Sequence, residues 1–236
     1  MFIVPDIFVA PTRKIVRKKK KTLSETARRK NGALKAVENV DRDLTKKRAG
    51  RLSAFAALPS KTSFETQERD EPIVLFLRRH WITNVSWVLL ALGLLAIPLI
   101  LGFFPSNPLM DVLPPRFQVF IYILWFLLIL SFVFEKFLGW FFNIYIITDE
   151  RVIDVDFYSM IYKQVASAAL DKIEDITYRT GGLSGSLFNF GNILIQTAGQ
   201  QPNIEFESVP MPSKVVAILN ELIAQEQQEI LDGRIR

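Results

Sequence analysis

The most prominent pattern in the chain is a pair of uncharged apolar runs joined by a short polar segment. The runs are VSWVLLALGLLAIPLILGFF (Val85–Phe104) and FQVFIYILWFLLILSFVF (Phe117–Phe134). A helix needs about 20 mostly apolar residues to cross a bilayer core about 30 Å thick, and both runs meet this requirement. The joining segment, Pro105–Arg116, holds four prolines and cannot continue a helix. The pattern predicts a transmembrane helical hairpin with spans at about 85–104 and 117–140.

The alternative is that both runs are core helices of a soluble protein. Helices that are apolar on every side would then need a large soluble shell, and the flanking segments are too short and too polar to supply one. Arg78 and Arg79 directly precede the first run, whereas the loop offers only Arg116. By the positive-inside rule we expect an inner-membrane protein with two spans and with both termini in the cytoplasm.

After Asn143 the pattern changes to the two-residue alternation that is typical of strands. The expected strands are Asn143–Thr148, Arg151–Phe157, Met160–Val165, Asp171–Arg179, Gly191–Thr197 and a last one that begins at Ile204. Pro212 then suits the first turn of a helix in which apolar residues form one stripe. Such an order predicts a small, partly open antiparallel β-barrel that one amphipathic helix closes.

Several runs resemble a known family. They are ITDERVIDVD, LDKIEDITY, GSLFNFGNILIQTAG and FESVPMPSKVVAIL, with RRHWI ahead of the hairpin. In their order and spacing they resemble the bacterial pleckstrin-homology (PH) domain proteins of the membrane-flanked family, over about Pro72–Ala224. The resemblance implies an α+β membrane protein, in which a transmembrane hairpin is followed by a PH-like antiparallel β-barrel capped by a C-terminal α-helix. It implies little chemistry, because the function of that family is largely unknown.

The chain therefore divides into three expected parts. Residues 1–70 form a basic, mostly disordered tail, residues 71–142 an interfacial segment and the two spans, and residues 143–236 a cytoplasmic PH-like domain. Residues 1–80 hold 20 Lys and Arg against 9 Asp and Glu, whereas residues 135–236 hold 8 against 14. Opposite charges on the two soluble parts suggest that they bind different partners, or each other.

The basic tail is a candidate for contact with membrane lipids, because each Lys or Arg near an anionic leaflet gains about 1 kcal/mol. The expected lipid-contacting residues are Arg13, Lys14, Arg17, Lys18, Lys19, Lys20, Lys21, Arg78 and Arg79. Nucleic acid is the less favoured partner, since the tail lacks interleaved aromatic residues on which bases stack. Plain disorder without a partner is the third interpretation.

The sequence contains little that indicates an enzymatic activity. The chain has no cysteine and a single histidine, His80, so we expect no metal site and no cofactor. Gly181–Ser186 (GGLSGS) lacks the G-x-S-x-G spacing of a nucleophile elbow, and no catalytic residues are assigned. Phosphoinositide-binding PH domains present a basic hairpin, but here the turn reads TDER, in which Asp149 and Glu150 offset Arg151.

The sequence thus favours a non-enzymatic integral membrane protein whose cytoplasmic PH-like domain serves as a protein-interaction or assembly module. Its partners would be membrane lipids and an unknown protein or a second copy of the chain. Two alternatives remain: a module that senses lipid headgroups at the anionic leaflet, and a basic tail that tethers nucleic acid to the membrane.

Overall fold

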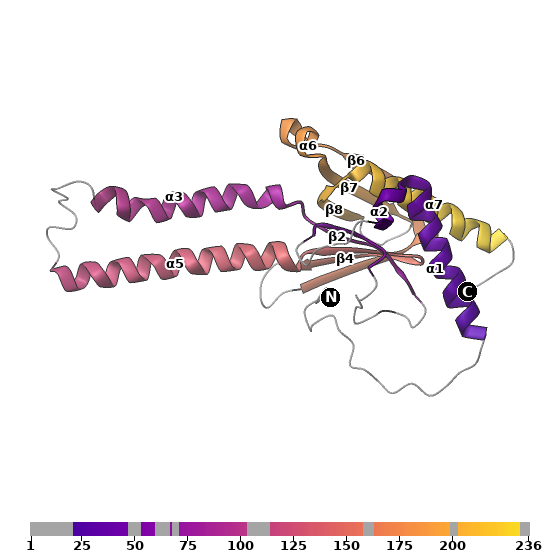
Figure 1. Ribbon diagram of the computed structural model, residues 1–236, viewed down its shortest axis with the longest axis horizontal. Coiled ribbons are helices and arrows are strands. Elements are labelled where there is room, and N and C mark those ends of the chain that lie inside the picture. Colours follow the sequence, from indigo (N-terminus) through magenta and orange to yellow (C-terminus); the bar gives the residue numbers. More distant parts are fainter. Residues whose placement is uncertain are drawn as a thin grey trace.

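Two long helices run side by side out of one end of a layered β domain (Figure 1). The computed structural model describes residues 21–46, 53–59, 67, 71–102, 114–157, 163–198 and 203–231. Its helices are α1 (Lys21–Val40), α2 (Arg42–Lys46), η2 (Trp81–Asn84), α3 (Val85–Gly102), α5 (Pro115–Phe142), η3 (Leu170–Lys172), α6 (Gly182–Phe188) and α7 (Pro212–Leu231). Its strands are β1 (Phe55–Ala57), β2 (Ile73–Arg78), β3 (Ile144–Thr148), β4 (Arg151–Phe157), β5 (Lys163–Ala169), β6 (Ile173–Arg179), β7 (Phe190–Thr197) and β8 (Ile204–Pro210).

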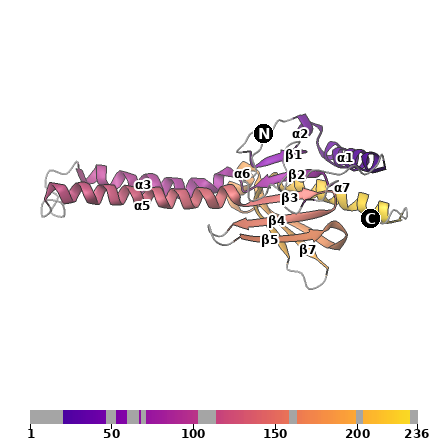
Figure 2. The ribbon, with the colours of Figure 1, turned by 90° about the horizontal axis from the view of Figure 1, so that it is seen from below.

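The strands form two antiparallel sheets, with strand orders β1-β2-β3-β4-β5 and β6-β7-β8. The expected strands after Asn143 are present, with bounds shifted by a few residues, and α7 begins at Pro212 as expected. The expectation of a barrel is wrong in one respect. Over the described strands no ladder joins β5 to β6, because the 3-10 turn η3 redirects the chain between them. The domain is therefore a pair of sheets covered by α7 rather than a closed barrel (Figure 2).

The helical hairpin is inserted between two neighbouring strands of the first sheet. β2 enters α3 through η2, α5 leads into β3, and β2 and β3 pair with Arg78 opposite Ile144. All six residues of β2 are buried, which explains why Ile73–Leu77 is apolar without alternation. The sequence assigned this stretch to an interfacial segment. In the structure it is an inner strand, so the PH-like domain begins before the hairpin.

The main core lies between the two sheets and the helices α1 and α7. Tyr145 of β3 and Phe206 of β8 stack with their ring centroids 4.6 Å apart, which joins the two sheets at the centre. A second buried cluster involves residues of β1 to β4: Ala56, Ile73, Phe76, Ile144, Ile146, Ile153 and Val155. The first sheet is thus buried on both faces, which ties its strands firmly to one another.

Helix α1 packs against α7, although the sequence assigned residues 1–70 to a mostly disordered tail. Ala33, Ala36 and Val37 are buried at this contact, and Arg28 forms an ion pair of 3.2 Å with Glu229 at its edge. The structure differs from the expectation over residues 21–46, because small alanine side chains let two helices approach closely without large apolar residues. Residues 1–20 lie outside the described part of the chain.

The hairpin helices contain two segments, Trp81–Leu101 and Arg116–Phe142, that are long and apolar enough to cross a membrane. Pro98 inside α3 has no N–H, so the carbonyl of Leu94, four residues earlier, has no donor within its own helix. The Nε1–H of Trp125 on α5 donates to this carbonyl at 3.1 Å. The two helices are therefore linked by a hydrogen bond at the point where the proline breaks the helical ladder.

We predict that Ala36→Glu releases α1 from α7, because a buried carboxylate without a partner costs several kcal/mol. Limited trypsin digestion of the detergent-solubilised protein checks this: cleavage at Arg28–Lys30 should become at least about tenfold faster. Leu34→Glu is the matched control, since Leu34 lies two residues earlier on the exposed side of the helix. Equal cleavage of the two variants would show that α1 is not held by this contact.

Candidate functional site

A pocket of about 560 Å³ lies where the hairpin meets the β domain. Its wall joins the base of both hairpin helices to the nearby ends of β2, β4 and β8. The lining residues are Arg79, Thr83, Asn84, Trp87, Ser131, Phe134, Glu135, Lys136, Leu138, Gly139, Trp140, Asn143, Asp156, Phe157, Glu207 and Ser208. We call it the junction pocket. It is the candidate functional site because it combines depth, charge and a place between two structural units.

Arg79, directly after β2, holds the pocket together. Its Nη2 lies 2.6 Å from Oε2 of Glu207 on β8 and 4.0 Å from Oδ1 of Asp156 on β4. Its backbone carbonyl accepts a hydrogen bond of 2.9 Å from Nε1 of Trp140, near the end of α5. One residue therefore contacts both sheets and the second hairpin helix, which fixes the hairpin relative to the domain.

Two buried ionisable groups lie behind Arg79. The hydroxyl of Tyr145 accepts a hydrogen bond of 3.0 Å from the backbone N–H of Glu207, and burial raises the pKa of this tyrosine to about 12. Burial, together with the nearby carboxylate of Asp156, raises the pKa of Asp154 to about 7, although Arg79 acts in the opposite direction. Asp154 therefore changes its charge near neutral pH, directly behind the pocket.

The pocket offers both signs of charge and an apolar wall. Arg79 and Lys136 are cationic, Glu135, Asp156 and Glu207 are anionic, and Trp87, Phe134 and Leu138 supply apolar surface. A ligand with an anionic group, a cationic group and an apolar chain would match this arrangement. Over the residues that the structure describes, no group of three or more His, Asp or Glu is placed to hold a metal ion.

The two expected lipid-contacting arginines beside the hairpin have different environments. Arg78 is only 1% exposed, with its guanidinium carbon 4.4 Å from the centroid of the Phe141 ring, and burial lowers its pKa to about 10. It has almost no surface to present to a lipid headgroup. Arg79 lines the junction pocket and is the one expected residue that the structure places in the candidate site.

The basic tail residues are not brought to the pocket by the described part of the chain. Lys21 begins α1 on the side of the domain away from the hairpin (Figure 1). The other expected residues, Arg13, Lys14, Arg17, Lys18, Lys19 and Lys20, lie outside the described residues. Contact of these lysines and arginines with lipid stays a prediction.

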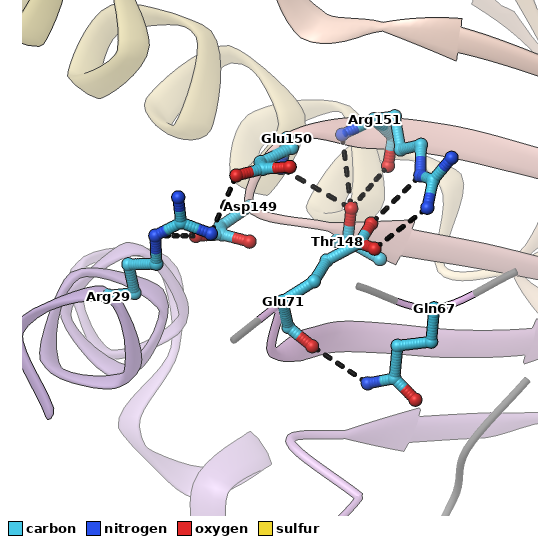
Figure 3. Close-up of polar contacts among 7 residues, drawn as sticks. All are labelled: Arg29, Gln67, Glu71, Thr148, Asp149, Glu150 and Arg151. Carbon is cyan, nitrogen blue, oxygen red and sulfur yellow. Dashed lines mark hydrogen bonds and ion pairs between the residues drawn. The ribbon is translucent and has the colours of Figure 1, made fainter. Parts of the chain in front are cut away.

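The TDER turn between β3 and β4 lies at the opposite end of the sheet from the hairpin, because β3 runs away from α5. Figure 3 shows that its charges are already paired: Arg151 donates from Nε and Nη2 to the two carboxylate oxygens of buried Glu71, at 3.0 and 2.9 Å. Nη1 of Arg29 on α1 lies 2.6 Å from Oε1 of Glu150. This turn therefore connects α1 to the sheet and is directed away from any membrane that the hairpin enters.

Sequence reasoning missed the junction pocket, because its residues come from four distant parts of the chain, within 79–87, 131–143, 156–157 and 207–208. Two signals were present: RRHW before the first apolar run and WFFN after the second. His80, the histidine of RRHW, is buried in the structure. Its ring stacks on Phe190 at 5.2 Å between centroids, and its Nδ1 accepts a hydrogen bond from the N–H of Ile82.

A comparison with known protein families identifies the family of this chain. A family model described as "Bacterial PH domain" matches residues 81–223, which includes the hairpin and most of the β domain. The chain belongs to the bacterial PH domain family. The match leaves out β1 and β2, the two strands that the structure adds before the hairpin.

A solved structure is also similar, namely a DUF1696 family protein with a pleckstrin-homology domain from Shewanella loihica PV-4. It is 20% identical, with a TM-score of 0.26, and the alignment covers 35% of this chain and 68% of that one. No curated protein matches the chain.

We predict that Asp154→Asn makes the stability of this bacterial PH domain protein less dependent on pH. A carboxyl with a higher pKa in the folded than in the unfolded chain stabilises below its unfolded pKa, near 3.8, and this contribution is lost as the pH rises through about 7. Removing the carboxyl should therefore raise stability at pH 8 relative to pH 5, by about 3 kcal/mol at most, because about two pH units of this interval lie below the folded pKa.

Thermal unfolding followed by tryptophan fluorescence in detergent measures this effect. The difference in Tm between Asp154→Asn and the unmodified protein should grow between pH 5 and pH 8. Exposed Glu174 provides the control, and Glu174→Gln should leave the pH profile unchanged. A pH profile that Asp154→Asn does not alter would contradict the assignment of this titration to Asp154.

Proposed function

We propose that this chain is a non-enzymatic inner-membrane protein that holds a PH-like domain against the cytoplasmic face as an interaction module. The observation that carries the proposal is the insertion of the hairpin between β2 and β3. Because these strands are hydrogen-bonded neighbours, both helices leave the same end of the sheet. That end of the domain would then face the membrane, and the opposite end would face the cytoplasm.

An open sheet edge supports a protein partner. Among the described strands β5 pairs with β4 alone, and no other described strand is hydrogen-bonded to its second edge. After Lys163 the strand contains no charged residue and no proline. Natural edge strands use both kinds of residue to prevent pairing with a strand of another chain. Val165 is 47% exposed on this strand. The ligand that fits such an edge is an extended segment of another protein or β5 of a second copy.

A photoreactive benzophenone amino acid at position 165 tests this interaction in intact bacteria. We expect a discrete cross-linked product, and we expect Ser167→Lys on the same strand to reduce its yield at least about fivefold, since charge on an edge opposes strand addition. The same amino acid at Ile230, an exposed position on α7, is the control and should give no such product. Equal yields at the two positions would contradict recognition at the β5 edge.

The junction pocket favours a second candidate function, the binding of lipid headgroups. A zwitterionic headgroup with a phosphate and a primary ammonium suits the pocket, because the phosphate can approach Arg79 and Lys136 and the ammonium Glu135 and Glu207. Its acyl chains would lie against the apolar helices. The TDER turn does not enter this proposal, since it lies at the other end of the domain.

Native mass spectrometry of the full chain tests the second candidate, with equal amounts of phosphatidylethanolamine, phosphatidylcholine and phosphatidylglycerol. Phosphatidylethanolamine should be retained most, and Glu207→Gln should reduce its retention several-fold by removing one anionic partner. Glu205→Gln is the control, because Glu205 lies on the same strand but pairs with Asn192 outside the pocket. Retention without lipid preference, or equal effects of the two variants, would contradict headgroup binding in this pocket.

A further inference from the structure

Helix α6 presents an unusually exposed apolar surface beside the hairpin. It connects β6 to β7 at the end of the domain from which the hairpin leaves, close to the base of α3 (Figure 1). Leu183 is 93% exposed and Leu187 is 78% exposed. The two leucines are four residues apart and therefore lie on the same side of the helix. An exposed apolar surface of this kind indicates a partner or a membrane.

This surface is connected to the first hairpin helix through aromatic side chains. Trp81, which begins η2 just before α3, is 54% exposed, and its ring lies 6.1 Å from that of Phe188 at the end of α6. We define the α6 surface as Trp81, Leu183, Leu187 and Phe188. Through the contact of Trp81 with Phe188, this surface lies beside the start of the hairpin.

The backbone holds α6 in its place. Gly182 at its first position has φ of +63°, and Asn189 just after it has φ of +52°, so both ends reverse the chain in the left-handed region. Gly185 is buried, and a Cβ atom at this position would lie 3.2 Å from the carbonyl oxygen of Phe190. The helix, GLSGSLF, contains no charged residue. Its insertion into lipid would therefore not require the dehydration of a charged group.

We propose that the α6 surface is an interfacial membrane anchor that inserts Leu183 and Leu187 into the leaflet entered by α3. The proposal rests on the proposed function, because it assumes that the hairpin spans the membrane. The contact of Phe188 with Trp81, the first residue of the apolar segment that contains α3, favours lipid over a protein partner. Trp81 also fits, since tryptophan is enriched at the headgroup level, and exposed Arg179 lies shortly before α6, where a cation can meet phosphates.

Site-directed spin labelling in lipid nanodiscs tests the anchor, and the absence of cysteine lets each label occupy one introduced position. Labels are attached to Leu183→Cys, Leu187→Cys, Leu128→Cys in the middle of α5, and Leu231→Cys at the far end of α7. Leu231 is the matched control because it is a leucine of similar exposure, 85%. Collision rates with oxygen and with a water-soluble nickel complex then report whether each label lies in lipid or in water.

We expect the oxygen-to-nickel ratio at positions 183 and 187 to exceed that at position 231 several-fold and to approach that at position 128. If positions 183 and 187 match position 231 while position 128 lies in lipid, the anchor is overturned and the membrane-spanning hairpin stands. Labels at 183 and 187 that are shielded from both reagents would also overturn it, by showing a protein cover. A label at position 128 that lies in water would overturn the proposed function itself. Unchanged Tm values confirm that each exposed substitution leaves the fold intact.

Discussion

The pairing of β2 with β3 is the interaction on which the rest of the structure depends, because both hairpin helices lie between these strands in sequence. Antiparallel pairing with Arg78 opposite Ile144 brings the start of one helix and the end of the other to the same edge of the domain. The pairing therefore fixes the orientation of the sheet relative to the hairpin. This pairing determines where the junction pocket, the α6 surface and the distal TDER turn lie relative to the hairpin.

Polar contacts divide the domain into two ends with different roles. At the end near the hairpin, Arg79 connects β4, β8 and α5 around a pocket that contains both signs of charge. At the far end, Glu71 and Arg29 neutralise the charges of the TDER turn and hold α1 against the sheet. The sequence is basic before the hairpin and acidic after it. In the structure part of the basic segment, helix α1, packs on the acidic β domain.

Sequence reasoning was accurate where the signal is local. It predicted the two apolar helices, the strands after Asn143, the start of α7 and the family. It missed β2, because the five consecutive apolar residues Ile73–Leu77 show no alternation and their partner strand β3 lies beyond both helices. It underestimated α1, whose contact depends on small residues such as Ala33 and Ala36 rather than on large ones. The junction pocket depends on distant residues that only the folded chain brings together, so no local pattern reveals it.

The insertion of the hairpin within the sheet also determines how the β domain can be separated from the hairpin. A fragment that begins at Asn143 would lose β1, β2 and α1, and it would leave the apolar edge of β3 uncovered. The two ends of the hairpin, however, lie on paired strands, about 5 Å apart between facing Cα atoms. A short turn in place of the hairpin would therefore preserve the sheet. The β domain is thus encoded in two separate pieces of the chain, and its first sheet is completed only after the second helix has been synthesised.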